Sequence, residues 1–199
     1  MITENMFYVF FGNNLVIGKH IKKQLSFLES IVPREFLYRQ VDDLGCGDGK
    51  VTLLLKQILQ PTEIHGFDIN HGLVRRAREK GIIAQAMNLD DEVPHGEMAV
   101  VWGVLHHLKY PERCLQKLKE NYPLIFIREP VKPGIVNGME LGHPMKMNDL
   151  ISMFRNRLPD LQMHYCENSV MAFYTSPEYM ENSQYNICHP EYKSTVQIT

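Results

Sequence analysis

Short apolar runs alternate with segments of helical periodicity along most of this 199-residue chain. The runs that we interpret as strands are 36–44, 63–69, 81–86, 98–104 and 124–127. Amphipathic helices are predicted at 18–30, 51–58, 72–80, 111–121 and 149–158. Strands that are joined through helices need crossover connections. This order therefore predicts an α/β fold with a doubly wound, mostly parallel sheet and helices on both faces.

The end of the pattern differs from the rest. Two further strands are predicted at 161–166 and 170–174, and only the turn 167–169 separates them, so we expect an antiparallel hairpin at one edge of the sheet. We expect a single domain over residues 1–176, whose N-terminal helical segment, 1–35, covers the site. Residues 134–147 are interpreted as a loop, and 177–199 as a polar tail without clear periodicity.

Composition excludes several classes of protein. Hydrophobic residues make up 44% of the chain and charged residues 22%, as in ordinary globular proteins. A net charge of −2 gives no electrostatic reason for a polyanionic partner and argues against nucleic acid. The four cysteines form no CxxC pair, which fits a reducing compartment and disfavours a zinc site. No run approaches the length of a membrane span. We expect a cytoplasmic monomer or homodimer with no membrane partner.

The stretch VDDLGCGDGK, residues 41–50, ends the first predicted strand. Its glycines allow a sharp turn and a close approach of the backbone to a ligand. The carboxylate of Asp43 is suited to an ammonium group. One βα unit later Asp68 closes the second strand, where an acid can accept both hydrogen bonds from a ribose diol. Ile69 would then lie against an adenine ring.

Two nucleotide classes compete for this arrangement. A dinucleotide site requires G-x-G-x-x-G, with the pyrophosphate on the helix N-terminus. Here the spacing is G-x-G-x-G, and Lys50 stands where the third dinucleotide glycine is needed. The carboxylates of Asp43 and Asp48 would also repel a pyrophosphate. Electrostatics therefore favours a ligand with an amino group and a positive centre over NAD.

Five segments in order resemble the class I S-adenosylmethionine-dependent methyltransferase superfamily, in its small-molecule type with an LHH motif. They are VDDLGCGDG (41–49), GFDIN (66–70), MNLDDEVP (87–94), VVWGVLHHL (100–108) and IFIREPVKPG (125–134). The resemblance implies a Rossmann-like sheet of seven strands with the last strand antiparallel. It also implies S-adenosylmethionine as cofactor and a small-molecule methyl acceptor.

The resemblance assigns cofactor-binding roles to ten residues and no metal site. Asp43, Gly45 and Gly47 are expected at the methionine end of the cofactor. Asp68 is expected at the ribose and Ile69 at the adenine. Asn88 stands where the family often has an aspartate, and an amide oxygen can still accept the adenine amino group. The full set is Asp43, Gly45, Cys46, Gly47, Asp68, Ile69, Asn88, Leu89, Trp102 and Gly103.

Catalytic candidates follow the fourth and fifth strands. If the acceptor needs a general base, His107 is the best candidate, and His106 and Tyr110 would border the acceptor. The histidines can also be a helix-start pair, one packed and one solvated, and we expect their side chains to point apart. Glu129 either orients an acceptor or pairs with Arg128.

Absent motifs narrow the reaction to methylation of O, N or C. The fourth strand runs into Trp102 and Gly103, and not into the acids of magnesium-dependent catechol-type enzymes or an N-P-P-Y motif. Two alternatives stay open: an RNA or protein acceptor, and a non-catalytic S-adenosylmethionine-binding module. The first would use a basic surface of Lys19, His20, Lys22, Lys23, Arg34 and Arg39.

Asp42 departs from the family, which usually has an apolar residue there. A buried carboxylate is costly unless it is paired. We expect its partner to be Arg39, Lys50 or the N-terminal helix.

Overall fold

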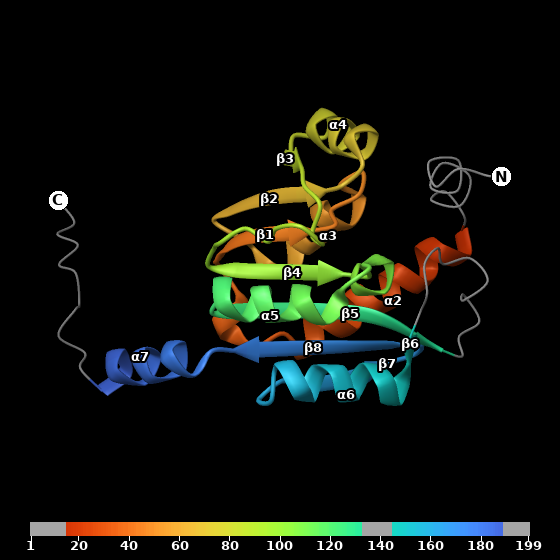
Figure 1. Cartoon of the computed structure of the whole chain (residues 1–199). Coiled ribbons are helices and arrows are strands. Elements are labelled where there is room, and N and C mark those ends of the chain that lie inside the picture. Colours follow the sequence, from red (N-terminus) through yellow and green to blue (C-terminus); the bar gives the residue numbers. More distant parts are fainter. Residues whose placement is uncertain (1–14, 133–144, 189–199) are drawn as a thin grey trace, which may run out of the picture.

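The computed structural model describes residues 15–132 and 145–188. Its central sheet has the order β3-β2-β1-β4-β5-β8-β7 (Figure 1). The first five strands are parallel, and β8 is antiparallel to both β5 and β7. This confirms the predicted sheet and its edge hairpin. The strands are β1 (Gln40–Leu44), β2 (Glu63–Asp68), β3 (Ile83–Ala86), β4 (Met98–Trp102), β5 (Leu124–Lys132), β7 (Gln162–Cys166) and β8 (Ser169–Thr175).

Helices cover both faces of this sheet. In Figure 1, α5 (Pro111–Asn121) and α6 (Met147–Arg157) lie in front of the strands, and α2 (Leu15–Ile31) and α3 (Lys50–Leu59) lie behind them. Two apolar clusters fill the layers, one around Leu115 and Phe154 and the other around Leu28 and Phe126. A further helix, α4 (His71–Glu79), packs against β2 and β3. Among the described helices, none has the length and apolar character that a membrane crossing requires.

The strand order reverses between β1 and β4, which are neighbours in the sheet. In open α/β sheets a ligand binds outside the carboxyl ends of the strands at such a switch point. The glycine turn after β1 and the segment after β4 meet there. The topology therefore places two of the sequence motifs side by side.

Several predicted strand boundaries were wrong, each for a local reason. The first strand begins at Gln40, because Arg34–Phe36 forms a 3₁₀ turn and Tyr38 has a φ of 60°. Strand β4 ends at Trp102, because Gly103 turns the chain with a φ of +69°. Strand β5 continues through Pro130, which is paired there with β8 after β4 has ended. A proline lacks the N–H that a neighbouring strand would need, and this is tolerated in β5 where β4 no longer pairs with it.

The first part of the polar tail is helical, since Pro177–Cys188 forms helix α7 although its sequence shows no clear periodicity. Its start follows the usual rules, with a proline in the first turn and the Ser176 hydroxyl accepting from the Tyr179 N–H. The predicted loop 134–147 ends in a short strand, β6 (Met145–Lys146), and the first residue of α6. Residues 1–14, 133–144 and 189–199 lie outside the described part.

Candidate active site

The glycine turn after β1 has a backbone that side chains would not tolerate. Gly45, Gly47 and Gly49 have φ values of +86°, +55° and +81°. A Cβ on Gly45 would lie 2.3 Å from a methyl carbon of Val104, so the turn after β1 and the segment after β4 pack directly together. The N–H groups of Gly45 and Cys46 both donate to the Phe67 carbonyl and tie the turn to β2.

Asp43 is buried beneath this turn, with 2% of its surface exposed. Burial raises the pKa of its carboxyl from the ordinary 3.8 to about 7, although the hydrogen bond from the Thr52 hydroxyl, at 2.5 Å, acts to lower it. The charge of Asp68 raises this pKa further. A carboxyl held in this state gains most from a cationic ligand.

Asp68 connects the two neighbouring strand ends. One of its oxygens accepts from the Gly47 N–H at 2.9 Å, and the other accepts from the Asn70 N–H at 2.8 Å. The carboxylate is therefore fixed in orientation at the end of β2. Ile69, the next residue, is 65% exposed, which is unusual for an isoleucine and suits a side chain that a flat ring covers.

Asn88 and Leu89 lie just beyond β3, whose Ala86 is paired with Asp68. The Asn88 amide donates to Asp91, and its oxygen accepts from the Asp90 N–H at 3.2 Å. The Asn88 side chain thus stabilises its own turn. Leu89 is buried in the core, so only its backbone is suited to contact with a ring.

Glu129 holds the segment that follows β4. It is fully buried, and one oxygen accepts from the N–H groups of Val104 and Leu105 at 2.7 and 2.8 Å. The other oxygen lies 2.8 Å from Nδ1 of His106. Glu129 therefore positions the turn and the histidine.

The two histidines lie in a 3₁₀ turn, Leu105–His107, and not at the start of an α-helix. His106 is buried and His107 is exposed, which agrees with the alternative that one histidine is packed and the other solvated. Their rings lie against each other, with centroids 4.0 Å apart, so the expectation that they point apart was wrong.

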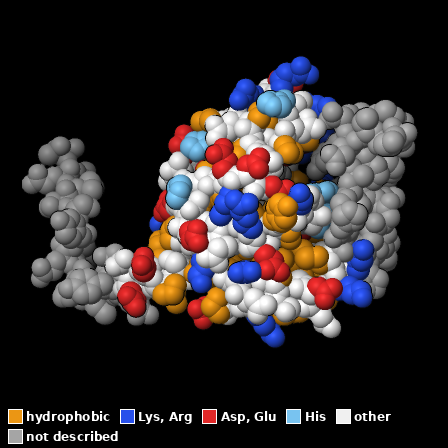
Figure 2. Space-filling model, viewed as in Figure 1, with side chains coloured by type: hydrophobic (Ala, Val, Ile, Leu, Met, Phe, Trp, Pro, Cys, Tyr) orange, Lys and Arg blue, Asp and Glu red, His pale blue; other side chains and the backbone are white. Residues whose placement is uncertain are grey.

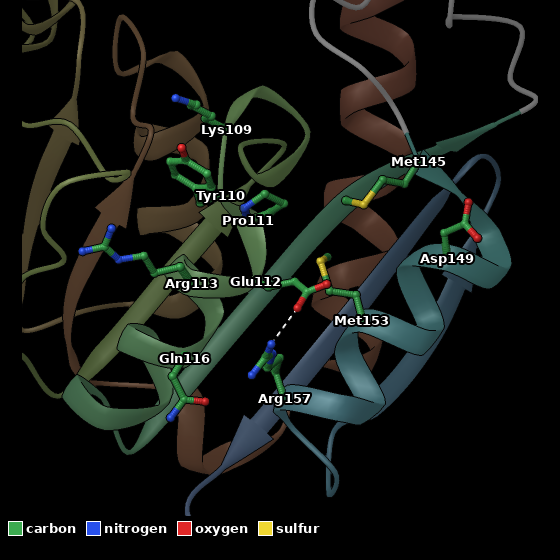
Figure 3. A pocket seen from close by; sticks show the side chains of 10 residues that line it. All are labelled: Lys109, Tyr110, Pro111, Glu112, Arg113, Gln116, Met145, Asp149, Met153 and Arg157. Carbon is green, nitrogen blue, oxygen red and sulfur yellow. Dashed lines mark hydrogen bonds and ion pairs between the residues drawn. The ribbon is translucent and has the colours of Figure 1, made fainter.

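Tyr110 lies farther along, before α5, and is 47% exposed. It lines a surface groove between α5 and α6 with a volume of about 700 Å³. Figure 3 shows this groove, with Met145 and Met153 on one side and the ion pair of Glu112 and Arg157 across it. None of the other predicted catalytic residues is among those that line it. The backbone of Tyr110 stays close to the predicted cofactor site, because its N–H donates to Asp90, two residues beyond Asn88, at 2.9 Å.

Two acids of the motif have partners that the sequence did not suggest. Asp42 accepts a 2.6 Å hydrogen bond from the Tyr122 hydroxyl and lies 3.3 Å from the His65 ring. The expected partners of Asp42 were therefore wrong. Asp48 pairs with Lys50 and Lys80, at 3.6 and 3.2 Å. Its charge is thus partly neutralised, and it contributes little to the repulsion of a pyrophosphate.

Sequence reasoning missed Thr52 and did not assign a role to Arg128. Thr52 is the buried residue that bonds Asp43, and its signal was a hydroxyl on the inward face of the helix after the glycine turn. Arg128 is buried beside Trp102. The thiol of Cys46 is buried too, and burial raises its pKa, so Cys46 contributes backbone and not a thiolate.

Comparisons with known proteins identify related chains. A family described as a methyltransferase domain matches residues 21–166. A tRNA (carboxymethyluridine(34)-5-O)-methyltransferase from Arabidopsis thaliana is 31% identical over 115 residues, which are 56% of this chain and 25% of that protein. The chain therefore spans a quarter of the length of this curated relative.

Solved structures share the fold. One belongs to the complex of the Haloferax volcanii Trm112 methyltransferase activator with a methyltransferase, with a TM-score of 0.63, 11% identity, and coverage of 86% of this chain and 97% of that chain. Another is magnesium protoporphyrin IX methyltransferase from Synechocystis PCC 6803 with bound SAH, with a TM-score of 0.58, 15% identity, and coverage of 81% and 87%.

The match over most of the chain places it in the methyltransferase-domain family. The chain is a methyltransferase domain, and it shares its fold with a methyltransferase that was crystallised with SAH.

Proposed function

We propose that this chain transfers a methyl group from S-adenosylmethionine to an O, N or C atom of a small molecule. The observation that carries the proposal is the pair of carboxylates at adjacent strand ends, Asp43 and Asp68. Gly47, in the glycine turn, lies between them and donates its N–H to Asp68. A cofactor with an ammonium at one end and a ribose at the other matches this pair.

The chemistry of these residues fits the cofactor. Asp43 is a buried carboxyl with a raised pKa, and a cation bound beside it would stabilise its charged form. The fixed carboxylate of Asp68 lies at the end of β2, where an acid can accept hydrogen bonds from ribose hydroxyls, and exposed Ile69 would cover one face of the adenine. Asn88 and the Leu89 N–H would reach the ring edge, with Trp102 and Gly103 beside the methionine end.

When bound, S-adenosylmethionine supplies a methyl group that is already activated for in-line displacement. The protein then has to hold the acceptor in line and exclude water. We assign His107 as the base that takes a proton from an acceptor that has one, because its ring is exposed after β4. His106 and Glu129 act as positioning residues, since Glu129 fixes the ring on which His107 packs. The alanine variant of His107 is expected to lose turnover, and unchanged turnover would remove this role.

Parallel titration calorimetry tests the proposal. S-adenosylmethionine and S-adenosylhomocysteine are expected to bind, and NAD is not. Asp68→Ala should weaken cofactor binding by about 1–3 kcal/mol, because ribose hydroxyls lose their acceptor. The exposed acid Asp160 gives a matched control, Asp160→Asn, which should bind normally. NAD binding without S-adenosylmethionine binding would overturn the proposal.

A second candidate acceptor is a carboxymethylated uridine in RNA, and the 31% identical plant relative favours it. The electrostatics supports a small molecule instead. Figure 2 shows Lys and Arg side chains interspersed with Asp and Glu over the visible described surface. In the basic surface expected for RNA, His20 and Lys23 pair with Glu167 and Arg39 pairs with Glu97.

Binding of tRNA at several salt concentrations separates the two candidates. A steep fall in affinity with salt, together with methyl transfer to 5-carboxymethyluridine in tRNA, would support the RNA acceptor. We expect no binding at low salt, and that result would end the RNA alternative.

A further inference from the structure

The segment that carries the two histidines, residues 104–110, is held by a carboxylate at each of its ends. At the start of this histidine segment, Glu129 of β5 accepts from two backbone N–H groups. At its end, Asp90 accepts from the N–H of Lys109 at 3.1 Å and from the N–H of Tyr110 at 2.9 Å, with one oxygen for each donor. Two acids from different parts of the chain therefore fix the backbone on either side of the histidines.

Asp90 belongs to the loop between β3 and β4, residues 87–97, which also carries the predicted adenine contacts. The Asp90 N–H donates to the side-chain oxygen of Asn88 at 3.2 Å, and the Asn88 amide donates to Asp91 at 2.7 Å. That oxygen of Asn88 is the atom expected to accept the adenine amino group. A change at the adenine edge therefore reaches Asp90 through a single hydrogen bond.

The rest of this loop is anchored farther along α5. The Lys117 ammonium donates to the Asp91 carbonyl, and the Asn121 amide donates to the Val93 carbonyl at 2.7 Å. These bonds fix the loop to the second half of the helix, away from the histidines. The bonds of Asp90 instead join the loop to the backbone directly ahead of α5, where Figure 3 shows Lys109 and Tyr110.

We infer that Asp90 is a positioning residue that couples cofactor binding to the placement of the histidine segment. The adenine fixes Asn88, Asn88 fixes the turn that bears Asp90, and Asp90 holds the backbone two and three residues after His107. Coupling between two sites typically changes an equilibrium about 5- to 150-fold. This inference rests on the proposed function and adds a means by which the bound cofactor regulates the acceptor side of the same site.

Amide hydrogen exchange measures this coupling without a methyl acceptor. Exchange rates of the Lys109 and Tyr110 N–H groups are recorded by NMR on the full chain, with and without saturating S-adenosylhomocysteine. In the wild type the ligand should slow both rates about fivefold or more, because a fixed Asp90 keeps both hydrogen bonds closed for longer. Unchanged rates in the saturated protein would contradict the inference.

Variants of two acids in the same loop separate coupling from a purely structural helix cap. Asp90→Ala removes both acceptor oxygens, so both rates should rise and should no longer respond to the ligand. Glu92→Gln changes an exposed acid and should respond as the wild type does. A carboxylate that only stabilises the N-terminus of α5 predicts faster exchange in Asp90→Ala but no response to the ligand in the wild type.

A second variant covers the case in which Asp90→Ala fails to fold by circular dichroism. Asp90→Asn keeps the shape of the side chain and one acceptor oxygen. The response to the ligand should then persist at only one of the two amides. An unchanged response at both amides would contradict the inference.

The outcomes separate this inference from the proposed function. Failure of the wild type to bind S-adenosylhomocysteine in calorimetry would reject the function itself. Normal binding without an exchange response at Lys109 and Tyr110, or a response that Asp90→Ala retains, would reject the coupling alone. A folded Asp90→Ala that no longer binds S-adenosylhomocysteine would also reject it, since Asp90 would then belong to the cofactor site.

Discussion

Asp43→Asn should make the ligand-free protein more stable while it weakens cofactor binding. The substitution keeps the shape of the side chain and its acceptor for the Thr52 hydroxyl, and it removes only the buried charge. Burial holds the pKa of Asp43 at about 7 in the folded protein, against an ordinary value of 3.8. A raised carboxyl pKa contributes stability that is complete below 3.8 and is lost as the pH rises through 7.

The size of the effect follows from that pKa. One pKa unit corresponds to about 1.4 kcal/mol, so between pH 5 and pH 8 the wild type should lose about 3 kcal/mol of unfolding free energy relative to Asp43→Asn. Urea denaturation followed by Trp102 fluorescence at several pH values measures this difference. Asp160→Asn removes an exposed charge and should show no such trend.

Cofactor affinity completes the test. Asp43→Asn should bind S-adenosylhomocysteine about 1–3 kcal/mol more weakly, because the ammonium loses its charged partner. A variant whose stability relative to wild type is the same at pH 5 and pH 8 would refute the view that Asp43 is a buried charge kept for a cationic ligand.

Three further predictions concern the same region. In the wild type, calorimetric affinity for S-adenosylhomocysteine should fall by up to about tenfold per pH unit below pH 7, because the Asp43 proton must leave before the ammonium binds, and a flat profile would contradict this. Gly45→Ala should lower the unfolding free energy by about 1–3 kcal/mol, since its Cβ would strike Val104 at a positive φ, and an unchanged denaturation midpoint would disprove the contact. Tyr122→Phe should also cost about 1–3 kcal/mol, because buried Asp42 loses its hydroxyl donor, yet cofactor affinity should stay normal; a loss of affinity would place Asp42 in the site.

Sequence reasoning could predict a cofactor half of the site because the signals for it are local. A strand that ends in glycines and a second strand that ends in Asp68 meet wherever parallel strands are neighbours. The signal at Gly45 is equally local, since the positive φ of this turn residue favours glycine. These features needed no knowledge of what packs against them.

The partners of buried polar groups could not be predicted, because they come from distant parts of the chain. Asp42 is bonded to Tyr122, 80 residues later, and Glu129 holds a turn that begins 25 residues earlier. Nothing at these positions in the sequence marks the pairing. Helix α7 was missed for a different reason: its exposed residues show no apolar period, and its start depends on Ser176 and a proline.

The position of S-adenosylhomocysteine in a crystal structure of the complex tests the central claim most directly. We predict the ribose hydroxyls within about 3 Å of the Asp68 carboxylate, the adenine against Ile69, and the ammonium next to Asp43. Ligand density away from the carboxyl ends of β1 and β2, or a ribose that contacts neither oxygen of Asp68, would contradict the account.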